Sequence, residues 1–172
     1  MFEKDIPEDM EKLDIKATVG DLFEKIVTEA ATIPEKAVLR DAVEAIIARE
    51  TTRKAYVVDN EGKLKGSITM ETLMRHLSYR LGARPPGVIS FFKFIGGIAS
   101  DKVTDFMAKP HPITRHTTIV DVVRKVMEER LNYFPVIDED GKLLGELNSL
   151  TLLKVTRTAF KRSKEGNDTE PS

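Results

Sequence analysis

Apolar positions in this chain follow the same order twice, about 80 residues apart. One-sided helical spacing covers residues 39–49 and returns over residues 119–130. Each of these segments is followed by two short apolar runs around an Asp-x-x-Gly-Lys turn, within residues 55–68 and 133–147. Two such runs around a turn predict a β-hairpin.

Short extended stretches and closing helices complete each copy. Residues 32–33 and 113–114 are brief apolar stretches that predict a first strand before each helix. Apolar positions after each hairpin, from residue 73 and from residue 150, predict a closing helix. The pattern therefore predicts the order β-α-β-β-α twice. A duplicated unit of this size usually stacks on its copy around a pseudo-twofold axis, which makes the cleft between copies the first place to look for a ligand.

The duplication and the breaker residues divide the chain into five predicted segments. They are a polar lead-in, the first repeat, a Gly/Pro-rich linker with an apolar insert, the second repeat, and a polar tail. In chain order they cover residues 1–16, 17–81, 82–102, 103–160 and 161–172. The tail contains few apolar residues, and we expect it to be disordered.

Composition narrows the class of protein. The chain has 172 residues, with 27 basic and 28 acidic side chains. It therefore lacks the basic surface that non-specific electrostatic binding to nucleic acid requires. It has no cysteine, which excludes disulfides, thiolate catalysis and Cys-ligated zinc. The start of the chain lacks the apolar core of a signal peptide, and no apolar run approaches a membrane span. We therefore expect a cytoplasmic protein that binds no nucleic acid.

Three stretches of sequence resemble the CBS domain, named for cystathionine β-synthase. They are Val103-Thr104-Asp105-Phe106-Met107, the strand Phe134-Pro135-Val136-Ile137-Asp138, and the Gly-Lys-Leu turn of each hairpin. The likeness covers about residues 17–160. It implies an α/β (α+β) fold in which two β-α-β-β-α repeats pack as a CBS pair, or Bateman module, with pseudo-twofold symmetry.

The resemblance also implies a regulatory function. CBS pairs typically bind adenosine nucleotides between their repeats, form homodimers, and report ligand occupancy to an enzyme, channel or transporter. No such catalytic or transport domain fits in this chain, so the resemblance implies a stand-alone module that is not itself an enzyme. The expected ligand is AMP, ADP, ATP or a related adenosyl compound, and the regulated partner is unidentified.

Two helix starts carry the expected ligand positions. In ligand-binding members of the family, the return strand ends in Ser/Thr-x-x-Asp, whose hydroxyl meets phosphate and whose carboxylate binds the ribose hydroxyls. Here Thr69 keeps the hydroxyl, but Thr72 replaces the Asp. In the second copy Asn148 and Thr151 occupy the two positions. Losing a hydrogen bond to a charged group costs about 1–3 kcal/mol, so both predicted sites should bind ribose more weakly.

Each predicted contact also has a purely structural interpretation. Thr69 and Asn148 are good N-cap residues, and they could cap a helix with or without contacting a phosphate. The family pattern places the adenine slot at the first strand and at the start of the second, where a place in the core is the stronger expectation for most residues. In this chain these positions are Thr32, Ile33, Ala55, Tyr56, Pro112, Ile113, Phe134 and Pro135.

Other chemistry finds little support in the sequence. His76, His111 and His116 have no metal-ligand spacing, and no nucleophile–base–acid set can be recognised, so we predict neither a metal site nor catalytic residues. Arg115 and His116 could face a phosphate or simply be solvated loop residues.

Residues 91–98, with three phenylalanines, form an apolar insert with two interpretations. The insert could be a helix packed on the module or in a dimer contact, or it could be a docking surface for a partner. Two functional hypotheses follow for the chain. The first is a ligand sensor that modulates a partner protein. The alternative is an interaction or dimerisation scaffold that has lost its ligand.

Overall fold

The computed structural model describes residues 16–49, 53–81, 93 and 96–153. Most of the predicted lead-in, half of the apolar insert, including its three phenylalanines, and the whole predicted tail lie outside these residues. The described part is a mixed α+β fold with two sheets, which confirms the fold class and the two repeats. The elements of the first repeat are β2 (Thr32–Pro34), α2 (Leu39–Ile47), β3 (Lys54–Val58), β4 (Leu64–Thr69) and α3 (Met70–Leu81).

The second repeat has the same order. Its elements are β5 (Ile113–Thr114), α5 (Ile119–Glu129), β6 (Tyr133–Ile137) and β7 (Leu143–Asn148), followed by helical residues 149–153. Two short elements, α1 (Phe23–Ile26) and β1 (Val27–Thr28), lie before β2, and the 3-10 turn η2 (Val103–Asp105) lies before β5. The predicted β-α-β-β-α order is therefore confirmed in both copies.

Local sequence explains where the two long repeat helices begin. At α5, the Thr118 side chain accepts a hydrogen bond from the Asp121 backbone N–H at 3.1 Å and donates to the Asp121 carboxylate at 2.7 Å. At α2, the Asp41 carboxylate accepts from the Val38 backbone N–H at 3.0 Å. Asp41 and Asp121 occupy equivalent positions in the repeats, and each carboxylate accepts a hydrogen bond from the residue that precedes its helix.

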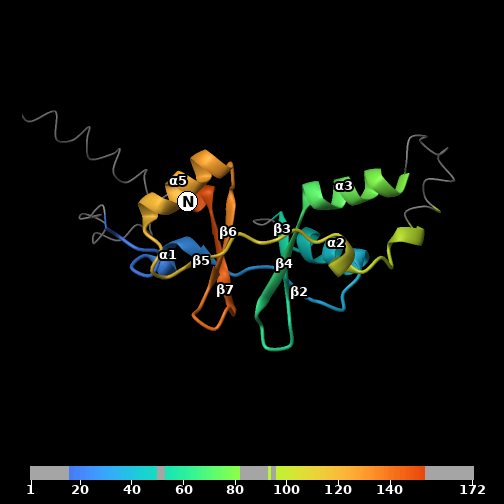
Figure 1. Cartoon of the computed structure of the whole chain (residues 1–172), viewed down its shortest axis with the longest axis horizontal. Coiled ribbons are helices and arrows are strands. Elements are labelled where there is room, and N and C mark those ends of the chain that lie inside the picture. The colour runs from blue at the N-terminus through green and yellow to red at the C-terminus, as the bar shows by residue number, and fades with distance from the viewer. Residues whose placement is uncertain (1–15, 50–52, 82–92, 94–95, 154–172) are drawn as a thin grey trace, which may run out of the picture. The chain divides into compact units, whose positions relative to one another are not determined.

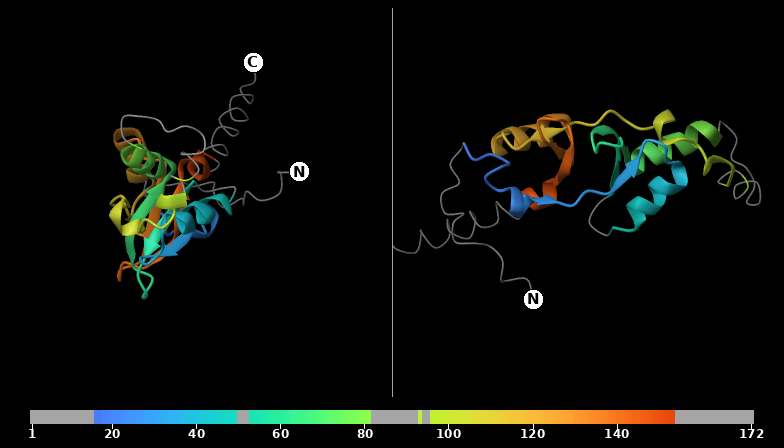
Figure 2. Two further views of the ribbon diagram at one scale, coloured as in Figure 1. Left: turned by 90° about the vertical axis from the view of Figure 1, so that its right-hand side faces the viewer. Right: turned by 90° about the horizontal axis from the view of Figure 1, so that it is seen from below.

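One compact unit contains residues 29–112 and 137–144; we call it unit 2. Its sheet has the order β2-β3-β4, with β2 parallel to β3, and β3 antiparallel to β4. Strand β4 leads directly into α3 (Figure 1), and α2 and α3 lie next to the sheet in the further views (Figure 2). Its core includes residues from the sheet, from α2 and from the segment after α3: Ile33, Ala42, Ala55, Val57, Ile68, Ile98 and Val103.

The other compact unit, unit 1, contains residues up to Thr28, together with 113–136 and the residues from 145 onward. Its sheet has the order β1-β7-β6-β5 (Figure 1). The strand β1 pairs antiparallel with β7, and Val27 lies opposite Leu147. The core of this unit is built from buried residues that include Val19, Ile26, Ile113, Val122, Phe134, Val136 and Leu147.

The residues that lead into the first strand of each repeat belong to the unit that contains the helices and strands of the other repeat. In unit 2, the backbones of Ala108 and Ser67 exchange two hydrogen bonds of 2.9 Å, and Val103 is fully buried. In unit 1, Ile119 N–H donates to the Ala17 carbonyl oxygen at 2.8 Å. The predicted segment boundaries follow the sequence duplication and remain a prediction. The two compact units do not coincide with these segments, because each unit contains parts of both predicted repeats.

The structure also bears on membrane insertion. Across the described residues, no helix is both long and apolar enough to cross a membrane.

Candidate functional site

The start of α3 holds a closed pair of threonine hydroxyls. Thr69 Oγ1 accepts a hydrogen bond from the Thr72 backbone N–H at 3.0 Å, which makes Thr69 the cap of the helix. The two hydroxyl oxygens also lie 3.0 Å apart and share a hydrogen bond. Thr72 is buried, whereas Thr69 is half-buried at the edge of the sheet. If Thr72 donates to Thr69, the proton of Thr69 remains free to donate to a ligand.

The start of the last described helix repeats this arrangement with an amide. Asn148 Oδ1 accepts from the Thr151 backbone N–H at 2.9 Å and from the Thr151 hydroxyl at 3.0 Å. Thr151 is buried, and Asn148 is half-buried. The two side-chain N–H groups of Asn148 are donors that this cap does not use. At both helix starts, the threonine in the expected ribose-binding position is engaged with the capping residue.

The strand register of unit 2 brings further polar residues to the Thr69 position. Lys54 pairs with Thr69, and Tyr56 pairs with both Ser67 and Thr32 in neighbouring strands. Cross-strand partners share a face of a sheet, and alternate residues of a strand do too, so all five lie on one face. The Lys54 ammonium lies 5.7 Å from the centre of the Tyr56 ring. This face therefore places a cation beside the capped start of α3.

Sequence reasoning missed Lys54. A lysine at the start of a strand is common, and only the pairing register shows that it lies opposite the capping residue Thr69. The predicted contacts Ile33 and Ala55 have the opposite orientation, because both belong to the buried core of unit 2. The structure thus brings Thr32, Tyr56 and Thr69 to one face and places the other two predicted residues on the core side.

The predicted residues of unit 1 divide in the same way. Ile113 and Phe134 are buried in the core. Because strand residues alternate between faces, Pro135 lies on the face opposite Phe134. By the same alternation, Glu146 and Asn148 lie opposite the core residue Leu147. Glu146 has an exposed fraction of only 1%, so this face of unit 1 has a buried carboxyl group where unit 2 has Ser67.

Arg115 is occupied by an aromatic contact. Its guanidinium carbon lies 3.7 Å from the centre of the Phe23 ring, in cation–π geometry. This contact holds the side chain against α1.

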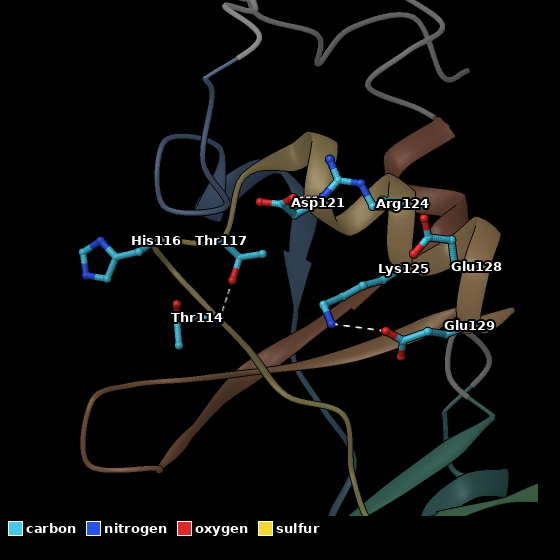
Figure 3. A pocket seen from close by; sticks show the side chains of 8 residues that line it. All are labelled: Thr114, His116, Thr117, Asp121, Arg124, Lys125, Glu128 and Glu129. Atoms are coloured by element: carbon cyan, nitrogen blue, oxygen red, sulfur yellow. Dashed lines mark hydrogen bonds and ion pairs between the residues drawn. The ribbon is translucent and has the colours of Figure 1, made fainter.

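A shallow depression of about 410 Å³ lies beside α5 in unit 1, and Figure 3 shows its lining. Four of its charged side chains are paired along the helix, Asp121 with Arg124 at 2.7 Å and Lys125 with Glu129 at 3.3 Å. His116 lines it, but none of the residues predicted for the two caps or for the adenine slot does. Within the part of the chain that the structure describes, no group of three His, Asp or Glu side chains could hold a metal ion.

Comparison with known families identifies the class of protein that this arrangement represents. The family model for the CBS domain matches residues 13–79 and 103–157, which is most of the chain. The chain therefore belongs to the CBS-domain family, with two copies of the domain. Proteins of this family are generally regulatory. No curated protein matches the chain.

Solved structures share the fold. A CBS domain-containing protein from Thermotoga maritima has a TM-score of 0.65 at 23% identity, with 84% of this chain and 97% of that chain covered. CBSX2, solved in complex with AMP, has a TM-score of 0.61 at 23% identity, with 85% and 98% covered. The cytosolic domain of the Mg²⁺ channel MgtE, solved in complex with ATP, has a TM-score of 0.54 at 25% identity, with 76% and 46% covered.

Proposed function

We propose that this CBS pair is a regulatory module that binds an adenosine nucleotide and modulates a partner protein. The observation that carries the proposal is the shared face of unit 2, on which Thr69 caps α3, and Lys54 lies opposite it. A hydroxyl group, backbone N–H groups at a helix start and an ammonium group together suit a phosphate. The family and the nucleotide complexes of CBSX2 and MgtE support this assignment.

The first test is thermal unfolding of the purified protein with AMP, ADP, ATP, NAD or S-adenosylmethionine. A ligand that binds only the folded state stabilises it by about 2.7 kcal/mol at a hundredfold excess over Kd. We expect a dose-dependent rise in Tm with at least one adenosine nucleotide. The rise should be smaller in Thr69→Ala, measured relative to that variant's own Tm without ligand. No shift with any compound at millimolar concentration contradicts nucleotide binding.

A second candidate function is a scaffold that binds no nucleotide. It is favoured by the closed caps, because Thr72 and Thr151 are buried and hydrogen-bonded to their own capping residues. A carboxylate at these positions would accept hydrogen bonds from the ribose hydroxyls with a full negative charge. A threonine hydroxyl that is already hydrogen-bonded to its capping residue is a much weaker acceptor for ribose. An unchanged Tm in the experiment above supports this candidate.

We also propose that the module forms a homodimer through its exposed helices. Ile47 and Met127 occupy equivalent positions in the repeats and are 71% and 75% exposed. Met74 and Leu153 are equivalent too, at 54% and 62%. Exposed apolar side chains repeated in this way are typical of a surface that another subunit covers.

Sedimentation velocity tests the dimer. Replacing both Ile47 and Met74 by Lys should convert the dimer to a monomer, because the substitutions bury charge in an apolar contact. Leu144→Lys is the matched control, because Leu144 is an exposed residue of β7 whose equivalent in the other repeat is already Lys65. A monomeric wild-type protein, or a dimer that survives the double substitution, contradicts this interface.

A further inference from the structure

The exposed helix face of unit 1 is apolar at four positions that share one side of their helices. Val120 lies two turns before Met127 on α5, and Leu150 lies one turn before Leu153 on the last described helix. All four side chains are exposed. Residues three or seven apart lie on the same face of a helix, so each pair extends the apolar surface proposed for the dimer.

The same face of unit 2 carries two charges. Arg40 is the equivalent of Val120 and lies two turns before Ile47 on α2. Glu71 is the equivalent of Leu150 and lies one turn before Met74 on α3. Glu71 contacts Arg75 of its own helix at 3.7 Å, but its side chain is 86% exposed, so this surface pair leaves it open to a further partner. The duplication has therefore kept the apolar face in one unit and placed one basic and one acidic residue on it in the other.

We propose that the homodimer joins like units, with Arg40 of one copy opposite the partner's Glu71. This inference rests on the proposed homodimer and names how its two chains are arranged. A contact with twofold symmetry is self-complementary, so Arg40 against the partner's Glu71 implies Glu71 against the partner's Arg40. Each charge on unit 2 then gains an opposite charge, and on unit 1 apolar side chains cover apolar side chains.

The opposite arrangement, in which each unit covers the other unit of the partner, gives these charges no counterpart. By the equivalence of the repeats, Arg40 would lie opposite the partner's Leu150, and Glu71 would lie opposite the partner's Val120. A charged side chain that loses its water and gains no opposite charge destabilises a contact. Charge complementarity therefore favours the like-unit arrangement.

Charge reversals in separate chains test the pair, with sedimentation velocity as the measurement. Arg40→Glu and Glu71→Lys should each raise the Kd of the dimer at least about tenfold, because like charges then face each other twice. An equimolar mixture of the two variants should form dimers close to the wild-type level, because both contacts of the mixed dimer again join opposite charges. Lys36→Glu is the matched control, since it reverses an exposed charge in the turn before α2 and should dimerise like the wild type.

Leu150→Glu distinguishes the two arrangements by the sign of its effect. In the like-unit dimer the added carboxylate is buried among apolar side chains and should raise the Kd of the dimer. In the opposite arrangement it would lie opposite the partner's Arg40 and lower the Kd.

Three results would overturn the inference while the homodimer itself stands. They are wild-type association of both charge-reversal variants, a mixture that stays monomeric, and tighter association of Leu150→Glu. A monomeric wild-type protein would instead overturn the proposed homodimer, and this inference with it.

Discussion

The Nε2 atom of His76 lies 2.8 Å from Oδ2 of Asp101, and this contact joins α3 to the segment that leads into the second repeat. The His76 ring also stacks on Phe106, with ring centres 4.4 Å apart. The Asp101 backbone carbonyl accepts from Leu39 N–H at 2.8 Å, so the same residue holds the start of α2. Asp101 thus connects two helices of unit 2 through one carboxylate and one carbonyl.

His76→Ala should lower the free energy of unfolding by about 2 kcal/mol. The substitution removes a hydrogen bond to a carboxylate and an aromatic stack, and the His76 side chain is only 12% exposed. Arg80 also contacts Asp101, at 3.3 Å, but its side chain is 48% exposed, and Arg80→Ala should cost less than about 1 kcal/mol. Urea unfolding of both variants measures the difference. Equal losses would mean that the His76 contact adds nothing beyond a surface ion pair.

Gly145→Ala should be more destabilising than Gly66→Ala. A Cβ atom at Gly145 would lie 2.7 Å from the carbonyl oxygen of Thr28, and that backbone is held in the sheet. A Cβ at Gly66 would instead meet the Met107 side chain, which can change rotamer. We expect a loss of about 3 kcal/mol for the first variant and about 1 kcal/mol for the second. Chemical denaturation measures both losses. A larger loss for Gly66→Ala than for Gly145→Ala would show that the backbone of β1 moves aside more easily than the Met107 side chain.

Much of the fold is predictable from the sequence because it rests on local periodicity. The apolar spacing around Ala42 and Val122 predicts one-faced helices, and the turns ending in Gly62 and Gly141 predict hairpins. Both predictions hold, and both turn glycines adopt positive φ, 80° and 81°. The capping roles of Thr69 and Asn148 were also predictable, since these residue types are strong N-caps.

The composition of the candidate site was not predictable, because it depends on register. The pairing of β3 with β4 shifts between Val57 and Val58. Continuing the unshifted register from the Val58–Leu64 pair would place Ile68, not Thr69, opposite Lys54. The pairing of β1 with β7 and the contact of His76 with Asp101 join residues far apart in sequence, and no periodic pattern encodes such contacts.

Asp59→Asn should make the protein less stable at pH 7 and less sensitive to acid. The pKa of Asp59 is lowered chiefly by the backbone N–H of Lys63, which donates to its carboxylate, with help from Lys65. A carboxylate with a lowered pKa stabilises the fold above its unfolded value, about 3.9, and this stabilisation is lost as pH falls through the folded pKa.

Thermal unfolding between pH 7 and pH 3 measures this effect. The Tm of the wild-type protein should exceed that of Asp59→Asn at pH 7. This difference in Tm should become smaller as pH falls below about 4 and the carboxyl group is protonated. A difference in Tm that does not change with pH would mean that the stability of the turn depends on the shape of the Asp59 side chain and not on its charge.

A fragment that ends before Ile98 should lack part of the core of unit 2. Ile98 and Val103 are 2% and 0% exposed, and they pack with the sheet and α2 of that unit although they follow α3 in sequence. A fragment of residues 29–95 lacks both, whereas a fragment of residues 29–112 contains them. The longer fragment should therefore show better dispersed amide NMR signals and a more cooperative thermal transition.

The full-length chain offers a milder form of the same test. Val103→Ala removes two buried methyl groups and should cost about 2 kcal/mol, the sum of lost burial and a small cavity. Val120→Ala is the matched control, because Val120 is 43% exposed on α5 and should cost less than about 1 kcal/mol. Equal losses of unfolding free energy in the two variants, or equally well-folded fragments, would contradict this prediction. The segment that contains Val103 would then contact unit 2 without being needed for its core. A large loss at Val103 alone would mean that the core of unit 2 depends on residues that lead into β5 of the other repeat.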